Sequence, residues 1–248
     1  MMNLRIKLTV VLISFLICGL DSNSQESAQG IIDKTIEVSG GDNYHNYIME
    51  FDFRHKHYVS KRNNGVFEYA RIVKDNGKKV IASYGNMKPF LLTINGEQKD
   101  ISKEKAKSIQ NSINSVNYFA LLPYGLNDKA VFKTYKGVNI IKGTKYYTIE
   151  VKFSEDGGGK DFEDVYLYWI NTTTYKVDYL AYSYLVDGGG VRFREAYNER
   201  YVNGLRFVDY NNYKSNDKSI ELSELPQLFM DEQLKLLSKI ELENISVN

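Results

Sequence analysis

Cysteine, histidine, proline and tryptophan are scarce in this chain. Its 248 residues include one Cys, three His, three Pro and one Trp. A single Cys excludes both a disulfide framework and a zinc site built on cysteines. Because a chain of this size without cross-links must be stabilised from within, we expect a substantial hydrophobic core.

An excess of charge of one sign is also absent. The chain carries 32 Lys and Arg against 31 Asp and Glu, which gives a formal net charge of +1. A neutral chain does not bind nucleic acid through a broadly basic surface, so no nucleic-acid partner is predicted. The composition, 25% charged and 43% hydrophobic, is typical of a folded protein and not of a disordered one.

Long hydrophobic runs are missing apart from residues 8–17. This run is shorter than the about 20 residues that a membrane-spanning helix needs. Because Arg5 and Lys7 precede it and small polar residues follow, we predict that residues 1–24 are a secretory signal. The remaining residues 25–248 are then expected to form one periplasmic or secreted domain.

The single cysteine, Cys18, leaves a second interpretation of the N-terminus open. A lipoprotein signal would end at this residue and make the chain an outer-membrane lipoprotein anchored through Cys18. The preceding Ile17 is bulky, whereas a lipoprotein peptidase prefers a small residue there. Contact with a membrane is therefore expected only through this alternative anchor.

Tyrosine, with 20 residues, is the most unusual component that is present. Tyr favours strands, and alternating patterns with turn signals between them predict about eleven or twelve antiparallel strands. These include one long strand from Met49 to Ser60, two separate strands at 130–135 and 138–141, and a last strand near 236–245. Ser27 and Ser102 are expected to cap two helices that end near Val38 and Ala120.

The central strands, 165–170 and 176–184, have bulky residues on both alternating faces. A sheet with one face in water shows polar residues on that face, so this pattern predicts two covered faces. The helix at 102–120 is expected to cover one of them. The other face can line a tyrosine-rich hollow for a ligand, or it can belong to an ordinary core with tyrosines at its rim.

A series of short motifs follows a familiar order along the chain. They are Asn117-Tyr118-Phe119-Ala120-Leu121-Leu122-Pro123, Lys136-Gly137, Thr148-Ile149-Glu150-Val151, Val165-Tyr166-Leu167-Tyr168-Trp169-Ile170, a turn at Asn171, and Asn203-Gly204-Leu205. This order resembles an exported bacterial family of unknown function that is similar in fold to the outer-membrane lipoprotein carriers LolA and LolB. The resemblance implies a mostly β, α+β fold: a single antiparallel half-barrel of about 11 strands with two helices packed against it. In the carriers the hollow holds acyl chains, and the family supplies no catalytic residues.

Six residues are candidates for binding a ligand in such a hollow. Four tyrosines are expected to line it, and two arginines on one face of a strand can clamp a carboxylate or phosphate head group. They are Tyr166, Tyr168, Tyr182, Tyr184, Arg192 and Arg194. The alternative for the arginines is a solvent-exposed face on which they pair with Glu195 or Glu199.

Two histidines, His55 and His57, are two residues apart on the expected long strand and would then share a face. Such a pair can supply two metal ligands or a pH-sensitive spot. The alternative is a pair of hydrogen-bonded histidines at a strand end, and no third ligand is evident. We therefore predict neither a metal site nor a cofactor.

The sequence contains no catalytic motif, such as Gly-x-Ser-x-Gly or His-Glu-x-x-His. We predict an exported, non-catalytic binding protein for a lipid or another hydrophobic or amphipathic molecule. Two alternatives remain: an envelope or surface protein with a solid core that contacts another protein, and a hydrolase that uses carboxylates or a metal.

Overall fold

The structure is a computed structural model that describes residues 26–156, 162–185 and 188–248. The predicted signal at 1–24 and Cys18 lie outside the described residues. Within these residues the α-helices are α1 (Ala28–Ser39), α2 (Lys103–Ala120) and α3 (Leu225–Met230), with short 3₁₀ turns η1 (Gly41–Tyr44), η2 (Tyr124–Asn127) and η4 (Leu222–Glu224).

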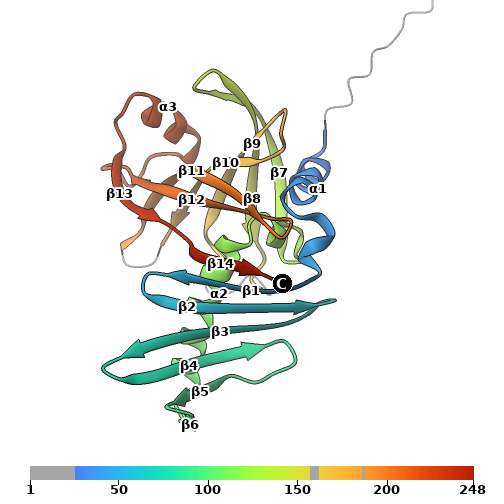
Figure 1. The fold of residues 1–248 in the computed structure, drawn as a ribbon. Coiled ribbons are helices and arrows are strands. Elements are labelled where there is room, and N and C mark those ends of the chain that lie inside the picture. Colours follow the sequence, from blue (N-terminus) through green and yellow to red (C-terminus); the bar gives the residue numbers. More distant parts are fainter. Residues whose placement is uncertain (1–25, 157–161, 186–187) are drawn as a thin grey trace, which may run out of the picture.

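The strands of the described residues form two seven-stranded sheets in which every neighbouring pair is antiparallel (Figure 1). The first sheet has the order β14 (Glu243–Val247), β1 (Asn46–Phe53), β2 (Lys56–Asn63), β3 (Val66–Asp75), β4 (Lys78–Gly85), β5 (Leu91–Ile94) and β6 (Glu97–Gln98). The second sheet has the order β13 (Lys235–Ile240), β12 (Leu205–Lys214), β11 (Gly190–Val202), β10 (Val177–Tyr184), β9 (Val165–Asn171), β8 (Thr144–Phe153) and β7 (Val131–Ile141).

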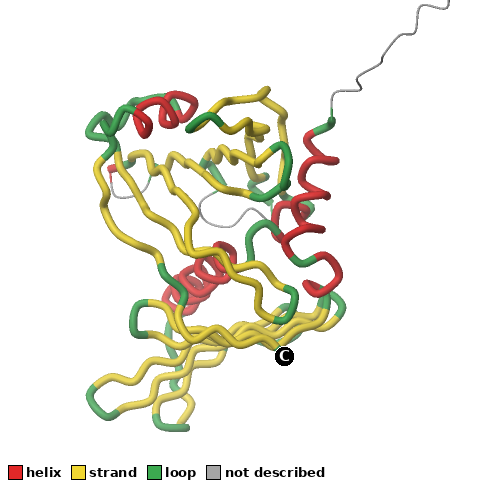
Figure 2. Tube along the Cα trace, turned by 45° about the horizontal axis from the view of Figure 1, so that its top comes forward, coloured by secondary structure: helices red, strands yellow, loops and turns green. Residues whose placement is uncertain are grey.

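The predicted fold class is confirmed: the chain is mostly antiparallel β, its sheets do not close, and helices pack against them. Ser27 and Ser102 cap α1 and α2, since their hydroxyl oxygens accept hydrogen bonds from the backbone N–H groups of Gly30 and Lys105. Figure 2 shows α2 enclosed between the two sheets and α1 at one side of the second.

The single strand expected from Met49 to Ser60 is wrong, because the chain reverses at Arg54 and His55. Both residues have positive φ, 47° and 61°, and they join β1 to β2 in a two-residue hairpin. Such turns usually contain Asn-Gly or Asp-Gly, and neither residue gives that signal. The alternation of polar and apolar residues continues through the turn, which is why the pattern resembled one strand.

Two further strand boundaries differ from expectation. The segments at 130–135 and 138–141 are one strand, β7, in which a bulge between Tyr135 and Val138 absorbs the Lys136-Gly137 pair. Conversely, the expected last strand is two strands, because β13 pairs in the second sheet and β14 in the first. The short link between Ile240 and Glu243 therefore carries the chain from one sheet to the other.

Both faces of the second sheet are covered, as the sequence pattern predicts. On one face the core includes α1 residues, Tyr166, Tyr168 and Leu180, with Tyr118 and Phe119 of α2 packed against it. The opposite face is covered by a protein segment, Leu222 to Leu234, and not by a tyrosine-lined hollow. Of the two interpretations of this face, the structure therefore agrees with the ordinary core.

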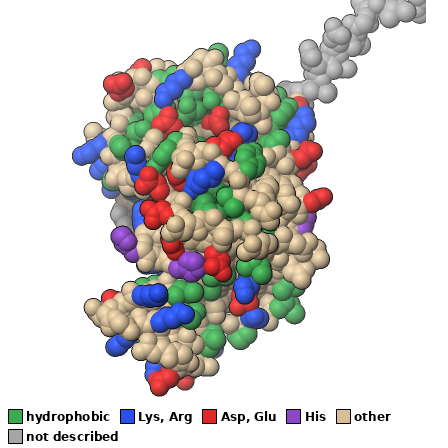
Figure 3. Space-filling model, viewed as in Figure 1, with side chains coloured by type: hydrophobic (Ala, Val, Ile, Leu, Met, Phe, Trp, Pro, Cys, Tyr) green, Lys and Arg blue, Asp and Glu red, His purple; other side chains and the backbone are tan. Residues whose placement is uncertain are grey.

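The surface carries no dominant charge on the face that Figure 3 shows, where acidic and basic side chains are interspersed. This distribution agrees with the near-zero net charge of the chain. Of the helices in the described ranges, none combines the length and the apolar character needed to cross a membrane.

Candidate ligand-binding site

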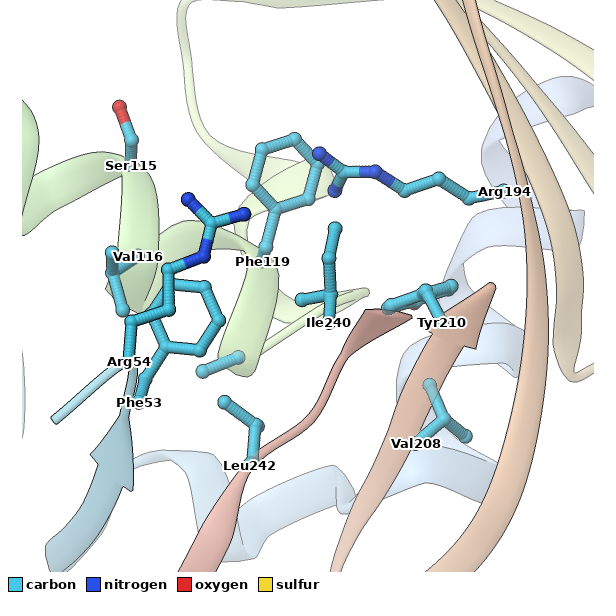
Figure 4. Close-up of a pocket in the computed structure, with 11 residues that line it drawn as sticks. Phe53, Arg54, Ser115, Val116, Phe119, Arg194, Val208, Tyr210, Ile240 and Leu242 are labelled. Atoms are coloured by element: carbon cyan, nitrogen blue, oxygen red, sulfur yellow. The ribbon is translucent and has the colours of Figure 1, made fainter. Parts of the chain in front are cut away.

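A pocket of about 210 Å³ lies where the C-terminal end of α2 meets both sheets (Figure 4). Its lining is mostly apolar and comes from α2, the end of β1, β12 and the link between β13 and β14. The apolar lining residues are Phe53, Val116, Phe119, Ala120, Val208, Tyr210, Ile240 and Leu242. The remaining lining residues are Ser115, Arg54 and Arg194.

Local structure explains why these side chains converge. Val116, Phe119 and Ala120 are spaced three and four residues apart, so one stripe of α2 faces the pocket. Val208 and Tyr210 are two apart on β12 and therefore share a face. The volume is below the about 300 to 1,000 Å³ of typical ligand pockets, so the pocket suits a small or single-chain molecule.

Arg194 of β11 is the most unusual residue of the pocket, since its side chain is charged yet only 7% exposed. Its Nη2 donates a hydrogen bond to the Tyr182 hydroxyl at 3.0 Å. The guanidinium carbon lies 4.2 Å from the ring centroid of Phe119, 5.1 Å from that of Tyr182 and 6.0 Å from that of Tyr210. Three aromatic rings thus surround the cation and stabilise it through cation–π contacts.

The hydrogen-bonding capacity of Arg194 is nevertheless not satisfied. Among the described residues, its buried Nε and Nη1 have no hydrogen-bond partner. No carboxylate in these ranges lies within 4.0 Å of it, and the two expected partners pair elsewhere: Glu195 with Lys142, and Glu199 with Lys176 and Arg206. The alternative that Arg194 forms a surface ion pair with Glu195 or Glu199 is therefore wrong.

A second guanidinium enters the pocket from the opposite wall. Arg54, in the turn between β1 and β2, is exposed and lies over the ring of Phe53 at 5.0 Å. Figure 4 shows the guanidinium groups of Arg54 and Arg194 both directed toward the ring of Phe119. The pocket therefore combines an apolar wall with two positive charges.

Other hollows on the described part of the protein are larger, at about 430, 590 and 700 Å³. None of the charged residues that line them has a side chain that is nine-tenths buried, as far as the described residues show. Of these four hollows, the pocket at α2 is the one that pairs an apolar lining with a buried cation, so we take it as the candidate site.

The four candidate tyrosines lie near this site but do not line it. Tyr166 and Tyr168 are buried in the core, and burial raises the pKa of both phenols, which keeps them protonated. The Tyr168 hydroxyl lies 3.4 Å from that of Tyr118 on α2, and Tyr182 stacks on Tyr166 at 5.3 Å. Tyr182 does not line the pocket but contacts two residues that do, Arg194 through its hydroxyl and ring, and Phe119 at 6.2 Å between ring centroids.

Arg192, the other candidate arginine, lies two residues from Arg194 on the same face of β11 but outside the pocket. Its Nη1 donates to the carbonyl oxygen of Val191 at 2.8 Å, and its guanidinium lies 4.8 Å from the Tyr184 ring. The two candidate arginines are thus not brought together around one ligand position.

The histidine pair does not share a strand face, since His55 lies in the turn and His57 in β2. The Nδ1 of His57 lies 2.8 Å from Oδ1 of Asp52, its cross-strand neighbour, and its Nε2 lies 3.4 Å from Glu50. The described residues contain no group of three His, Cys, Asp or Glu side chains that can hold a metal ion.

A model of a family of unknown function, DUF6503, matches residues 7–242. The chain belongs to that family. This membership agrees with the predicted resemblance to a family of unknown function. The comparison with curated proteins gave no match.

Among solved structures, the chain is similar to a DUF1329 family protein from Desulfovibrio piger, with 10% identity, a TM-score of 0.46, and coverage of 90% of this chain and 93% of that one. It is also similar to a LolA superfamily protein from Nitrosomonas europaea, with 10% identity, a TM-score of 0.43, and coverage of 90% and 92%. A third is a putative outer membrane lipoprotein-sorting protein domain from Vibrio parahaemolyticus, with 10% identity, a TM-score of 0.39, and coverage of 80% and 99%. Similarity of this degree does not identify a ligand, which the residues of the pocket must define.

Sequence reasoning found Arg194 but missed Arg54 and the residues of the sheet-to-sheet link. Arg54 was placed on the polar face of a long strand, and Leu242 inside a continuous last strand. Neither carries a local signal that distinguishes it from an ordinary strand residue. Their role in the pocket depends on contacts between segments far apart in the chain.

Proposed function

We propose that this chain is an exported, non-catalytic binding protein that holds a hydrophobic or amphipathic molecule in the pocket at the end of α2. The observation that carries the proposal is the convergence of half-buried apolar side chains from α2 and both sheets on one space. Burial of such surface by an apolar chain is favourable by about 25 cal/mol per Å². The space equals the liquid volume of about seven water molecules, which suits one short chain rather than several acyl chains.

Displacement of the neutral dye Nile red by decan-1-ol tests this proposal on the purified full-length protein. We expect saturable dye binding that decan-1-ol competes away. Val116→Phe places a ring in the pocket and excludes part of the ligand from it. We expect the affinity for both Nile red and decan-1-ol to fall at least about tenfold, because each excluded segment of the ligand is worth about 1–3 kcal/mol of binding free energy. The absence of saturable binding, together with no amphiphile in mass spectra of organic extracts, would contradict the proposal.

Asn114→Phe is the matched control for this experiment. Residue 114 is exposed on α2 and does not line the pocket, so the same aromatic group is added outside the proposed site. We expect binding by this variant to match the wild type. Equal losses in Val116→Phe and Asn114→Phe would assign the effect to general disturbance of α2 and not to the pocket.

Export is part of this proposal and rests on the N-terminal pattern described above. Intact-mass measurement and N-terminal sequencing of the protein from its native envelope distinguish the two forms. Cleavage of the predicted signal gives a chain that begins at Gln25, whereas a lipoprotein begins at an acylated Cys18. A chain that retains residues 1–24 without acylation would contradict both forms.

A protein-contacting role is a second candidate, and it is favoured by the edge strand β7. Phe132, Val138 and Ile140 on this strand are 61%, 51% and 59% exposed, and no described strand pairs beyond it in the second sheet. Exposed apolar edge strands are templates for pairing with another chain. Capture of a partner from envelope extract by the wild type, but not by Val138→Lys, would support this role.

A further inference from the structure

No carboxylate of residues 26–156, 162–185 or 188–248 neutralises the charge of Arg194. A cation buried without an opposite charge is costly, and removing it from water is normally offset by an ion pair and a full set of hydrogen bonds. Arg194 has the aromatic contacts and one hydrogen bond to a neutral hydroxyl, but its Nε and Nη1 have no partner among the described residues. The guanidinium therefore retains hydrogen-bonding capacity that an anion can use.

The residue opposite Arg194 in the neighbouring strand also has unused polar capacity. Asn212 of β12 is the cross-strand partner of Arg194 and is 7% exposed. Its Nδ2 donates to the Ser238 hydroxyl at 3.1 Å, whereas its buried Oδ1 has no partner among the described residues. This oxygen only accepts hydrogen bonds and does not line the pocket, so the case for an anion rests on Arg194.

The second cation of the pocket, Arg54, also favours a negatively charged ligand. Arg54 is directed into the pocket from the other wall, and no carboxylate of the described residues lies within ion-pair distance of it or of Arg194. Two cations facing one apolar pocket disfavour a cationic ligand and favour an anionic one. A guanidinium also matches the planar, two-oxygen shape of a carboxylate.

From these contacts we propose that Arg194 binds the carboxylate of a single-chain amphiphile whose apolar chain lies against Phe119, Val208 and Ile240. This inference rests on the proposed function and specifies the class of its ligand. Arg54, at the exposed side of the pocket, contributes long-range attraction and not a buried contact. The aromatic rings around Arg194 hold the guanidinium in position before the ligand arrives, which lowers the entropy cost of binding.

Calorimetric titration of the full-length protein with decanoate and decan-1-ol at pH 8 tests the proposal. The two probes share a chain length and differ in the charged group. Because a hydrogen-bonded charge pair contributes about 1.5–3 kcal/mol, decanoate is expected to bind the wild type about 10- to 100-fold more tightly. In Arg194→Gln this preference is expected to fall below about threefold.

Two further variants locate the effect. Arg192→Gln removes the same charge from the same strand face outside the pocket, so a loss of decanoate preference equal to that of Arg194→Gln would overturn the assignment to Arg194. Arg54→Gln changes an exposed turn residue and is expected to lower decanoate affinity about two- to fivefold, an effect that 0.5 M NaCl removes. A salt-independent loss in this variant would contradict the long-range role of Arg54.

The outcomes separate this inference from the proposed function. Equal binding of decanoate and decan-1-ol by the wild type overturns the carboxylate site while the proposed function stands. Failure of both probes to bind contradicts the proposed function and the inference with it. If thermal melting and near-ultraviolet circular dichroism show that Arg194→Gln does not fold, the wild-type preference and the Arg54→Gln result still decide the question.

Discussion

Asp209 is the residue whose replacement tests most directly how the two sheets are joined. It lies on β12, is 2% exposed, and accepts three hydrogen bonds. Its Oδ1 accepts from Nη2 of Arg200 at 3.0 Å and from the backbone N–H of Leu242 at 3.0 Å, and its Oδ2 accepts from Nδ2 of Asn198 at 2.6 Å. One carboxylate thereby connects a bulge in β11 with the link that leads from β13 to β14.

The expected cost of Asp209→Ala follows from these contacts. Removing one partner of a buried ion pair costs about 3–5 kcal/mol because it leaves the other charge unpaired. The Arg200 side chain is 25% exposed and keeps a hydrogen bond to the Leu242 carbonyl, so water can restore part of its solvation. We therefore expect the free energy of unfolding to fall by about 3 kcal/mol, which lowers the melting temperature by about 6–12 °C in a chain of this size.

Urea unfolding followed by the fluorescence of Trp169, which is fully buried, measures this loss. Glu97→Ala is the control, since its ion pair with Lys99 is at the surface and its side chain is 78% exposed. We expect no measurable change in the control. A loss below about 1 kcal/mol in Asp209→Ala would refute the view that this carboxylate joins the sheets.

Two other predictions concern stability. Phe229→Ala in α3 removes ring contacts with Phe193 at 5.0 Å and Tyr213 at 5.2 Å. We expect it to lower the free energy of unfolding, measured in urea, by about 3–5 kcal/mol. A loss below about 1 kcal/mol would show that α3 is not needed to cover the sheet. Hydrogen bonds from Asn244 and His57 hold the pKa of Asp52 below its ordinary value of 3.8. The resulting stabilisation is complete above that value and is lost as pH falls through the lower pKa of the folded state, so Asp52→Asn should flatten the dependence of stability on pH below about pH 4. An unchanged acid profile would contradict this cause.

The sequence predicted those elements whose signals are local. Both long helices start at the serine caps that were expected, and the turn after β9 uses Asn171, whose side-chain oxygen accepts from the backbone N–H groups of Thr173 and Thr174. The Asn203-Gly204 hairpin and both covered faces of the second sheet follow from patterns within one or two strands. The Arg54-His55 turn was missed because positive φ at such residues has no strong sequence signal.

The candidate site was predictable only in part, because its walls come from five separate regions of the chain. Arg194 could be selected from the sequence as one of two arginines, with Arg192, that share a strand face. The tyrosines of the same face were expected beside the ligand, but Tyr118 and Phe119 of α2 lie on them and complete the core. The accessible part of that face is set by two features: the position at which α2 ends, and the path of the chain past Ile240 and Leu242 from one sheet to the other. The sequence pattern of a single strand predicts neither feature.

The tyrosines also bear on where the counter-ion of Arg194 must come from. A phenolate beside the guanidinium would neutralise it without any ligand. Burial, however, raises the pKa of Tyr166, Tyr168 and Tyr210, and the opposing influence of Arg194 does not reverse this direction. These phenols therefore stay neutral at physiological pH, and among them Tyr210 contacts Arg194 through its ring, at 6.0 Å. Glu195 and Glu199 pair with other cations, and no carboxylate of the described residues lies within ion-pair distance of Arg194, which supports the anionic ligand proposed above.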